Sequence, residues 1–415
     1  MAAAGYGPGM VAAAFVAPYL LEATARFVRA AARLPGVELV LITCEPKRRV
    51  PPDLRGRLAA HWRLDDPLDA RQITTAVQAI SEHIAPVRRL LAVLEQLQVP
   101  LAQAREHLGI DGMNAATARN FRDKAQMKSV LRAAGVACAR YRLCDSAGAA
   151  AAFAADTGFP LVVKPPAGAG AKSTFRLDDP GDLRVWLQTA PPGPGRPALV
   201  EEFLTGEEGS YDSVMIEGRV VWHSISAYLP TPLEVLRNPW IQWRVLLPRD
   251  IGGPEYDAIR AVAPAALRAL GLRTGFTHME WFRRPDGSVA VSEVAARPAG
   301  GQLTAMLGYA HDFDFYGAWA ELMALDRFGS PRRRRAAGTV FLRGQGIGRV
   351  QAVRGVAELW AELSPLVVES RLPEPGQQSS ASYEGDGYVI VAHPDTAAVQ
   401  KAMWRLVTGV RVELG

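Results

Sequence analysis

Residues 275–297 read GFTHMEWFRRPDGSVAVSEVAAR, a pair of strand-like runs separated by the turn signal Pro-Asp-Gly-Ser. Aromatic and β-branched residues favour strands, and Asp-Gly between two such runs predicts a β-hairpin. With the turn centred on the Asp-Gly pair, the pairing places Glu280 directly opposite Glu293 and His278 opposite Ala295. Two acidic side chains are therefore expected to face each other on one side of the hairpin.

Carboxylates at facing positions, about 5 Å apart, repel each other and destabilise a sheet unless a cation lies between them. Mg²⁺ is commonly bound by one or two carboxylates together with substrate phosphates, and oxygen ligands favour Mg²⁺ or Mn²⁺ over zinc. The pair therefore predicts a divalent-cation site formed by Glu280 and Glu293. Two alternatives are a salt bridge from Arg297, which could also clamp a carboxylate or phosphoryl group, and a three-residue loop that breaks the register.

A second candidate site lies upstream, where a predicted strand at residues 158–164 ends in Lys164 and continues into a glycine-rich loop. Backbone N–H groups of such a loop can approach phosphate oxygens, and a lysine adds a point charge. The loop residues concerned are Gly168, Gly170, Lys172 and Ser173. A flexible surface turn is the alternative interpretation.

The segment EEFLTGEE at residues 201–208 closes another predicted strand, at residues 198–203. Charged residues at a strand end are often only edge decoration. Alternatively, the segment forms a nucleotide hinge, in which backbone groups of Phe203 and Leu204 meet an adenine edge and a carboxylate takes the ribose hydroxyls. The segment alone does not decide between the two interpretations.

The remaining pattern predicts an α/β N-terminal part followed by a mixed α and β remainder. Residues 11–16 and 37–43 have the length of buried strands, and the helical pattern of residues 19–34 between them predicts a βαβ unit with a parallel sheet. No Gly-x-Gly-x-x-Gly follows the first strand, so a dinucleotide site is poorly supported. Further helices are predicted at residues 69–82, 87–97, 114–134, 147–157 and 255–270, and strands at residues 211–215, 220–225, 338–343 and 387–392.

Composition excludes several classes of protein. Of the 415 residues 49% are hydrophobic, which is enough for full cores and excludes wholesale disorder. No apolar run approaches the ~20 residues of a membrane span, and residues 11–21 lack the basic leader of a signal peptide, so we expect a cytoplasmic protein. The basic run at residues 332–335 has no aromatic neighbours, so no nucleic-acid partner is expected. Three cysteines indicate a reducing compartment rather than a disulfide framework or a structural zinc site.

Taken in chain order, the candidate site residues resemble those of the ATP-grasp superfamily. The resemblance runs from about residue 114 to residue 325 and is carried by Lys124, Lys164, the glycine-rich loop, Glu201, Glu208, Glu280, Glu293 and Arg297. It implies a mixed α/β and α+β architecture. The implied parts are a Rossmann-like pre-ATP-grasp domain at residues 1–112, a small ATP-grasp subdomain at 113–197, a large subdomain at 198–328 and a small C-terminal α+β domain at 329–415.

In such enzymes ATP lies between the two ATP-grasp subdomains, and the resemblance implies a role for each matching residue. It implies phosphate contacts from Lys124, Lys164 and the glycine-rich loop, adenine contacts from Glu201, Phe203 and Leu204, a ribose contact from Glu208, Mg²⁺ or Mn²⁺ ligands in Glu280 and Glu293, and an anchor for the substrate carboxylate or acyl phosphate in Arg297.

Within the superfamily, THME at residues 277–280 together with SEVAARPAGG at residues 292–301 is similar to the L-amino-acid ligase, or carboxylate–amine ligase, branch. Many ATP-grasp enzymes carry Asn two residues after the second metal-binding Glu, whereas this chain has Ala295 there. We hypothesise that His278, or water held by it, fills part of this gap. A histidine that packs within the hairpin or holds substrate is the alternative.

The segment YLPTPLEVLRNPWIQW at residues 228–243 is aromatic and proline-rich and lies between the hinge segment and the hairpin. It could line an acceptor pocket suited to an apolar or aromatic amino-acid side chain, or it could be an aromatic strand in the core. The candidate substrate contacts are Tyr228, Trp240, Gln242 and Trp243.

The sequence therefore predicts a Mg²⁺- and ATP-dependent ligase that joins a carboxylate to an amine, both amino acids, through an acyl phosphate. Its catalytic candidates are Arg297, Lys164 and His278, and no residue stands out as the base for the amine. The alternatives are a carboxylase-type or other ATP-grasp ligase, and a non-catalytic ATP-binding regulator, which Ala295 would support. Small carboxylates and amines are the expected partners, and a homodimer is the default oligomer.

Overall fold

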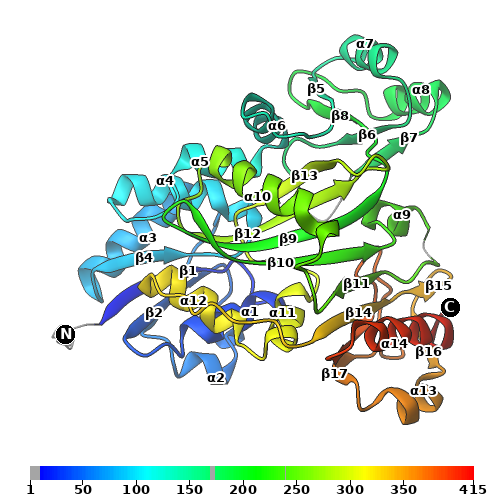
Figure 1. Cartoon of the computed structure of the whole chain (residues 1–415). Helices are drawn as coiled ribbons and strands as arrows, with labels where there is room; N and C mark the ends of the chain where they lie inside the picture. Colours follow the sequence, from blue (N-terminus) through cyan, green and yellow to red (C-terminus); the bar gives the residue numbers. More distant parts are fainter. Residues whose placement is uncertain (1–9, 169–172, 239) are drawn as a thin grey trace.

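A computed structural model describes residues 10–168, 173–238 and 240–415 (Figure 1). Within these residues the strands form four sheets: a four-stranded parallel sheet, a second four-stranded sheet, a central eight-stranded sheet and a three-stranded sheet. No helix in this part of the chain is long and apolar enough to cross a membrane.

The N-terminal part forms the parallel sheet, in the order β3-β2-β1-β4. Its elements are β1 (Val11–Val16), α1 (Glu22–Ala31), β2 (Val37–Thr43), η1 (Lys47–Arg49), α2 (Pro52–Arg55), β3 (Ala60–Arg63), α3 (Ala70–His83), β4 (Val87–Leu91), η2 (Glu95–Leu97) and α4 (Gln98–Leu108). The predicted βαβ unit is confirmed, because β1 pairs in parallel with β2. The helix predicted at residues 87–97 is wrong: its first half is the edge strand β4, which also pairs with β1.

The next part contains the antiparallel sheet β5-β8-β6-β7 with helices beside it. Its elements are α5 (Ala115–Arg122), α6 (Lys124–Ala133), β5 (Tyr141–Cys144), α7 (Ala147–Thr157), β6 (Leu161–Lys164), β7 (Phe175–Leu177), α8 (Pro180–Thr189) and β8 (Ala198–Glu202). The single helix predicted at residues 114–134 is two helices, because Asp123 leaves the helical conformation and its side chain accepts hydrogen bonds from the N–H groups of Ala125 and Gln126. This break makes Lys124 the first residue of α6.

The central sheet has the strand order β13-β12-β9-β10-β11-β14-β18-β17, so strands near the C-terminus extend it. The elements of this half are β9 (Glu207–Ile216), β10 (Arg219–Leu229), α9 (Pro232–Arg237), β11 (Arg244–Leu247), η3 (Pro254–Tyr256), α10 (Asp257–Leu270), β12 (Gly275–Arg283), β13 (Val289–Ala295), α11 (Leu303–His311), α12 (Phe315–Leu325), β14 (Ala336–Leu342), β15 (Gly344–Gln345), β16 (Val350–Arg354), α13 (Val356–Leu363), β17 (Val367–Arg371), β18 (Gly387–His393), α14 (Thr396–Gly409) and β19 (Arg411–Leu414).

The β12–β13 hairpin has the predicted pairing where the candidate site lies. Glu280 faces Glu293, and His278 faces Ala295. Nearer the turn the register differs by one residue from the prediction, since Trp281 faces Val291. An irregularity at this point restores the pairing, as a β-bulge does when one strand carries an extra residue.

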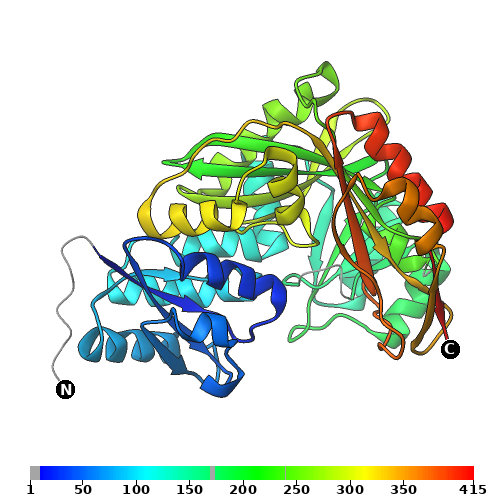
Figure 2. The same ribbon diagram turned by 90° about the horizontal axis from the view of Figure 1, so that it is seen from below.

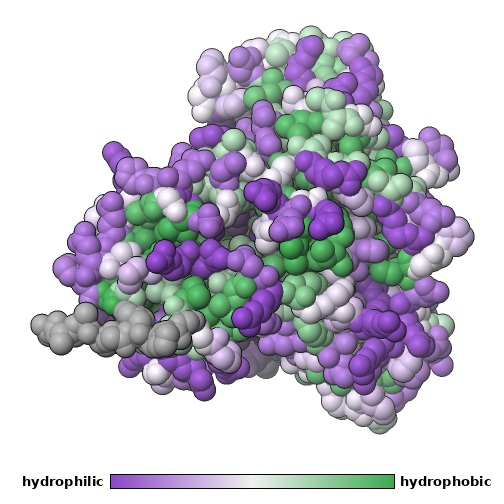
Figure 3. All heavy atoms as spheres, turned by 60° about the vertical axis from the view of Figure 1, so that its left-hand side comes forward, coloured by the Kyte–Doolittle hydropathy of each residue, from purple (hydrophilic) through white to green (hydrophobic). Residues whose placement is uncertain are grey.

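One hydrophobic core joins the N-terminal sheet to the central sheet through α11 and α12. Phe15 of β1 and Phe27 of α1 pack against Trp319 of α12, with ring centroids 5.6 and 5.2 Å apart. Figure 2 shows α1 and α12 lying side by side. Figure 3 shows small hydrophobic patches separated by hydrophilic side chains on one face of the molecule. The shared core fixes the N-terminal sheet against the strands that carry the candidate site.

Candidate active site

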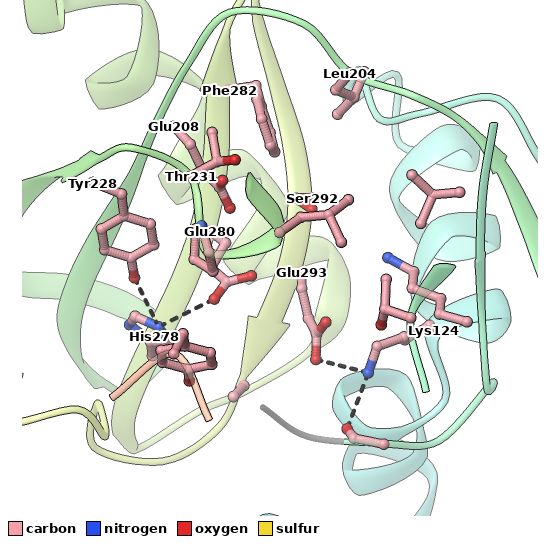
Figure 4. A pocket seen from close by; sticks show the side chains of 18 of the residues that line it. Lys124, Leu204, Glu208, Tyr228, Thr231, His278, Glu280, Phe282, Ser292 and Glu293 are labelled. Atoms are coloured by element: carbon pink, nitrogen blue, oxygen red, sulfur yellow. Dashed lines mark hydrogen bonds and ion pairs between the residues drawn. The ribbon is translucent and has the colours of Figure 1, made fainter. Parts of the chain in front are cut away.

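A cavity of about 1380 Å³, which includes space open to solvent, lies where β6, β8, β12 and β13 meet the start of α6. The sequence-predicted residues that line it are Lys124, Lys164, Gly168, Glu201, Phe203, Leu204, Glu208, Tyr228, Trp243, His278, Glu280, Glu293 and Arg297. Figure 4 shows Glu208, Glu280 and Glu293 pointing into the cavity from one side and Lys124 from the other. Two clusters predicted from separate stretches of sequence therefore form one site.

Lys124 connects the glycine-rich loop to the hairpin. Its Nζ lies 2.8 Å from Glu293 Oε1 and donates a hydrogen bond of 3.1 Å to Gly168 O (Figure 4). Burial would raise the pKa of Glu293, but Lys124 and Lys164 outweigh it and lower that pKa. Glu293 therefore stays ionised in the site.

Lys164 and Glu201 form a buried ion pair that extends to a third residue, Lys128. Glu201 Oε2 lies 3.0 Å from Lys164 Nζ, and Glu201 Oε1 lies 3.3 Å from Lys128 Nζ. The Glu201 carboxylate therefore lies between two lysines, and the predicted contact with adenine stays a prediction. Lys128 also donates a hydrogen bond of 3.2 Å to Ser292 O, so it holds the irregular part of β13 in place.

Glu208 and Glu280, which come from strands β9 and β12, have no direct contact with any lysine or arginine that the structure describes. Burial and then the charge of Glu280 raise the pKa of Glu208 well above its ordinary value. The only ion pair of Glu280 within the described residues is a contact of 3.8 Å between its Oε1 and His278 Nε2. Excess negative charge at this point suits a bound cation.

His278 is held by groups on neighbouring strands. Its Nδ1 lies 2.7 Å from Asp212 Oδ1, and its Nε2 lies 3.4 Å from the Tyr228 hydroxyl (Figure 4). Burial would lower the pKa of His278, but Asp212 and Glu280 outweigh burial and raise it to about 9. A protonated imidazole donates from both nitrogens. That His278, or water held by it, fills part of the gap left by Ala295 stays a prediction.

Arg297 is anchored by Glu95, a cavity residue that comes from η2 of the N-terminal part. Arg297 Nη2 lies 3.0 Å from Glu95 Oε2, and Arg122 Nη1 lies 3.0 Å from Glu95 Oε1. Burial would lower the pKa of Arg297, but Glu95 outweighs it and raises that pKa. Glu95 therefore fixes a permanently charged guanidinium in the cavity wall.

Aromatic rings form one end of the cavity. Tyr228 and Trp243 contact each other with centroids 5.4 Å apart, and Tyr383 packs on Trp243 at 4.7 Å. The structure does not place the other two candidate substrate contacts of this segment in the cavity wall. Trp240 is 62% exposed and does not line the cavity, and Gln242 is buried, where it exchanges hydrogen bonds with the backbone of Arg343.

The glycine-rich loop is only partly described. Gly170 and Lys172 lie outside the described residues. Ser173 is exposed and does not line the cavity, whereas the next residue, Thr174, does. At the hinge, the Phe203 N–H donates to Pro160 O, and the Arg176 guanidinium lies 4.1 Å from the Phe203 ring.

Sequence reasoning missed four residues that shape the site. Glu95 follows the end of a parallel strand, a position where α/β proteins often place functional groups. Lys128 lies one helical turn after Lys124, and this spacing could have indicated a shared face. Asp212 alternates with Ser210 on β9 as an inward polar residue. Tyr383 comes from far along the chain and left no signal.

The site fits a divalent cation bound together with phosphates. Within the described ranges, no three His, Cys, Asp or Glu side chains come close enough to form a metal site on their own. Mg²⁺ sites at phosphates commonly use only one or two protein carboxylates, and Glu280 and Glu293 supply that number at facing positions. Oxygen ligands and neighbouring lysines are the groups that Mg²⁺ and triphosphate need.

No protein-family model matches the chain. Among curated proteins, it is 26% identical over 309 residues to the uncharacterized protein y4rH of Sinorhizobium fredii, and 25% identical over 261 residues to the L-arginine-specific L-amino acid ligase of Bacillus subtilis. These alignments cover 69% and 60% of this chain. They span 60% and 62% of the relatives, or about three fifths of their lengths.

Solved structures share the fold over nearly the whole chain. The L-amino acid ligase of Bacillus licheniformis superposes with a TM-score of 0.76 at 19% identity, covering 99% of this chain and 100% of that one. The biotin carboxylase domain of the Hydrogenobacter thermophilus 2-oxoglutarate carboxylase, solved with MgADP, ADP and bicarbonate, superposes with a TM-score of 0.66 at 16% identity, covering 97% and 91%. The chain therefore has the ATP-grasp fold, and L-amino acid ligases are among the proteins it resembles.

Proposed function

We propose that this protein is an ATP-dependent carboxylate–amine ligase that joins two amino acids through an acyl phosphate and releases ADP and phosphate. The observation that carries the proposal is the meeting, in one cavity, of the Glu280–Glu293 pair, Lys124 and Lys164, and the anchored Arg297. Each group matches one need of the reaction: cation binding, phosphate binding and carboxylate binding.

In the first step a substrate carboxylate oxygen attacks the γ-phosphorus of ATP. The bond between that phosphorus and the β–γ bridging oxygen breaks, and ADP leaves. Lys164 and Lys124 point their ammonium groups into the space where phosphate charge develops, and Arg297 can hold the carboxylate with two parallel hydrogen bonds. Mg²⁺ bound by Glu280 and Glu293 would neutralise phosphate charge.

In the second step the amine nitrogen attacks the acyl carbon, the bond from that carbon to the phosphate oxygen breaks, and the nitrogen loses a proton. Arg297 remains beside the departing phosphate. His278 lies at the aromatic end of the cavity, where its hydrogen bonds to Asp212 and Tyr228 allow it to orient a substrate. The aromatic wall of Tyr228, Trp243 and Tyr383 suits an apolar amino-acid side chain.

The similarity to the two L-amino acid ligases supports amino acids as substrates. The experiment incubates the purified protein with Mg²⁺-ATP and pooled amino acids, and measures ADP release together with new masses by mass spectrometry. We expect ADP and a new amide mass, both absent with the Glu293→Gln variant. ADP release that requires bicarbonate would instead indicate a carboxylase, and ATP binding without turnover under every condition would favour a non-catalytic regulator.

A further inference from the structure

A second cavity, of about 1480 Å³ including space open to solvent, lies between the N-terminal sheet and the central sheet. Its walls come from β4 and α4 on one side and from α12 and the segment leading into β12 on the other. Ala296 lines this cavity, whereas its neighbours Ala295 and Arg297 line the first. None of the residues assigned to the proposed reaction lines this second cavity.

Arg105 of α4 lines the second cavity with an unbalanced positive charge. Its side chain is 6% exposed. Nε donates a hydrogen bond of 3.2 Å to Leu90 O, and Nη2 donates to the same oxygen. Within the described part of the chain, Arg105 Nη1 makes no hydrogen bond. No described carboxylate forms an ion pair with this guanidinium either. Burial lowers the pKa of Arg105 to about 10, with no neighbouring charge opposing it.

A structural role alone does not explain this charge. The contact with Leu90 O needs only N–H groups, which a neutral glutamine would supply. A buried charge without a counter-ion is costly, and native proteins normally pair such groups. Gly112 packs against the side chain with a positive φ of 147°, and a Cβ there would lie 2.9 Å from Arg105 Cδ. The guanidinium of this cavity-lining residue is thus held in place, and among the described residues Nη1 has no partner, which leaves it available to an anion.

The rest of the cavity supplies complementary groups, beside Arg273 and the Arg89–Asp326 ion pair, which also line it. Asp111 contributes an exposed carboxylate that has no ion pair within the described residues, and Met113, Phe276 and Met323 contribute apolar side chains. A cation at one place, an anion at another and an apolar wall together match the groups of an apolar α-amino acid. We propose that this cavity binds a free apolar α-amino acid, with Arg105 holding its carboxylate and Asp111 its ammonium group.

The proposal does not depend on the reaction proposed above, and calorimetric titration of the full chain tests it. Each titration adds one amino acid: L-leucine, L-methionine or L-phenylalanine. The proteins titrated are the wild type, Arg297→Gln, Arg105→Gln and Arg119→Gln. Arg119→Gln is the matched control, because it changes an exposed arginine on the neighbouring helix α5. We expect at least one of the three to bind Arg119→Gln as it binds the wild type, and to keep a binding event in Arg297→Gln, where the first cavity has lost its proposed carboxylate anchor. Arg105→Gln should weaken that same binding event about tenfold or more, the effect of losing a charged hydrogen bond. Equal binding to Arg105→Gln, or no binding of any of the three, would overturn the proposal.

A second variant keeps the proposal testable if Arg105→Gln does not fold. Asp111 is exposed, so Asp111→Asn should leave the fold intact. If L-leucine binds, its analogue without the amino group, 4-methylpentanoate, should bind the wild type several-fold more weakly than L-leucine does. The analogue should also bind Asp111→Asn and the wild type equally well. For L-methionine or L-phenylalanine, the corresponding analogue without the amino group is used. If Asp111→Asn weakens both ligands equally or neither, no ammonium contact exists and the proposed ligand class is wrong.

Discussion

The paired glutamates are the feature at the residue scale on which the proposed chemistry depends most. Glu280 and Glu293 face each other. Among the residues that the structure describes, Glu293 contacts Lys124 and Glu280 has only the weak contact with His278. Each substitution to glutamine keeps the size of the side chain and removes one negative charge. We expect Glu280→Gln and Glu293→Gln each to lower ADP release by about 10²-fold or more while the protein remains folded. Steady-state ADP assays beside circular dichroism would check this, and wild-type rates in both variants would contradict the cation site.

Arg297 should act on the carboxylate substrate and not on ATP. Its guanidinium is held by Glu95 and is the buried cation placed to accept a carboxylate. We expect Arg297→Gln to lower kcat/KM for the carboxylate by about 10–10²-fold, the value of one charged hydrogen bond or a bidentate pair, with little change in nucleotide affinity. Kinetics with each substrate varied in turn would show the split. An equal loss of ATP affinity would place Arg297 at the nucleotide instead.

Chelation of divalent cations should have a matching effect on the wild type. Burial and then the charge of Glu280 raise the pKa of Glu208, and within the described residues the only ion pair of Glu280 is its 3.8 Å contact with His278. We expect EDTA to abolish ADP release and added Mg²⁺ or Mn²⁺ to restore it. Ca²⁺ should restore ADP release less well, because it prefers more and longer oxygen contacts. Full activity in EDTA would show that the carboxylates have another role.

At the scale of elements, the start of α6 positions Lys124. Asp123 caps this helix, and Asp395 caps α14 in the same way, far from the site. We expect Asp123→Ala and Asp395→Ala each to lower the free energy of unfolding by about 1 kcal/mol. Only Asp123→Ala should also weaken nucleotide binding, because Lys124 is the first residue of the helix. Denaturant unfolding and nucleotide titration of both variants would check this. Equal effects of the two variants on nucleotide binding would show that the Asp123 cap does not position Lys124 for the nucleotide.

The hairpin shows how far pattern can predict structure. Turn chemistry and alternation were enough to pair Glu280 with Glu293 and His278 with Ala295. The register near the turn was not predictable, because it depends on an irregularity at Ser292, whose carbonyl Lys128 holds from another helix. The edge strand β4 was mistaken for a helix because its short apolar run has no distinct periodicity and its pairing with β1 is long-range.

At the scale of the whole molecule, a cluster around Glu369 ties the two ends of the chain together. Glu369 of β17 accepts hydrogen bonds of 2.7 Å from Arg26 of α1, 2.9 Å from Tyr309 and 2.7 Å from Tyr388. Burial would raise the pKa of Glu369, but these donors outweigh it and lower that pKa. A lowered carboxyl pKa stabilises the folded state above the unfolded-state pKa, and this stability is lost as the pH falls through the folded-state value.

We therefore expect Glu369→Gln to lower the free energy of unfolding at neutral pH by about 1–2 kcal/mol. The difference from the wild type should shrink as the pH falls below about 4.3, the ordinary pKa of a glutamate. Urea unfolding across this range would measure it. A difference that stays constant with pH would show that Glu369 contributes packing and no charge effect.

Which residues come together in the site was harder to predict from the sequence than which residues are candidates for it. The lysines, the glutamates and Arg297 could be named from local motifs, and the structure places them in one cavity. Glu95 and Tyr383 could not be named in this way. Glu95 comes from the N-terminal part and Tyr383 from the segment between β17 and β18, and only the tertiary fold brings them to the site. Trp240 and Gln242 were misplaced because an aromatic, proline-rich segment does not reveal which side chains turn toward the cavity.

The acyl phosphate is tested most directly by oxygen-18 transfer. Amino acids labelled with oxygen-18 in the carboxyl group are incubated with the protein and Mg²⁺-ATP, and the released phosphate is analysed by mass spectrometry. We predict that each phosphate released with amide formation carries one labelled oxygen from the carboxylate. Label in AMP, or unlabelled phosphate beside a newly formed amide, would contradict the proposed mechanism.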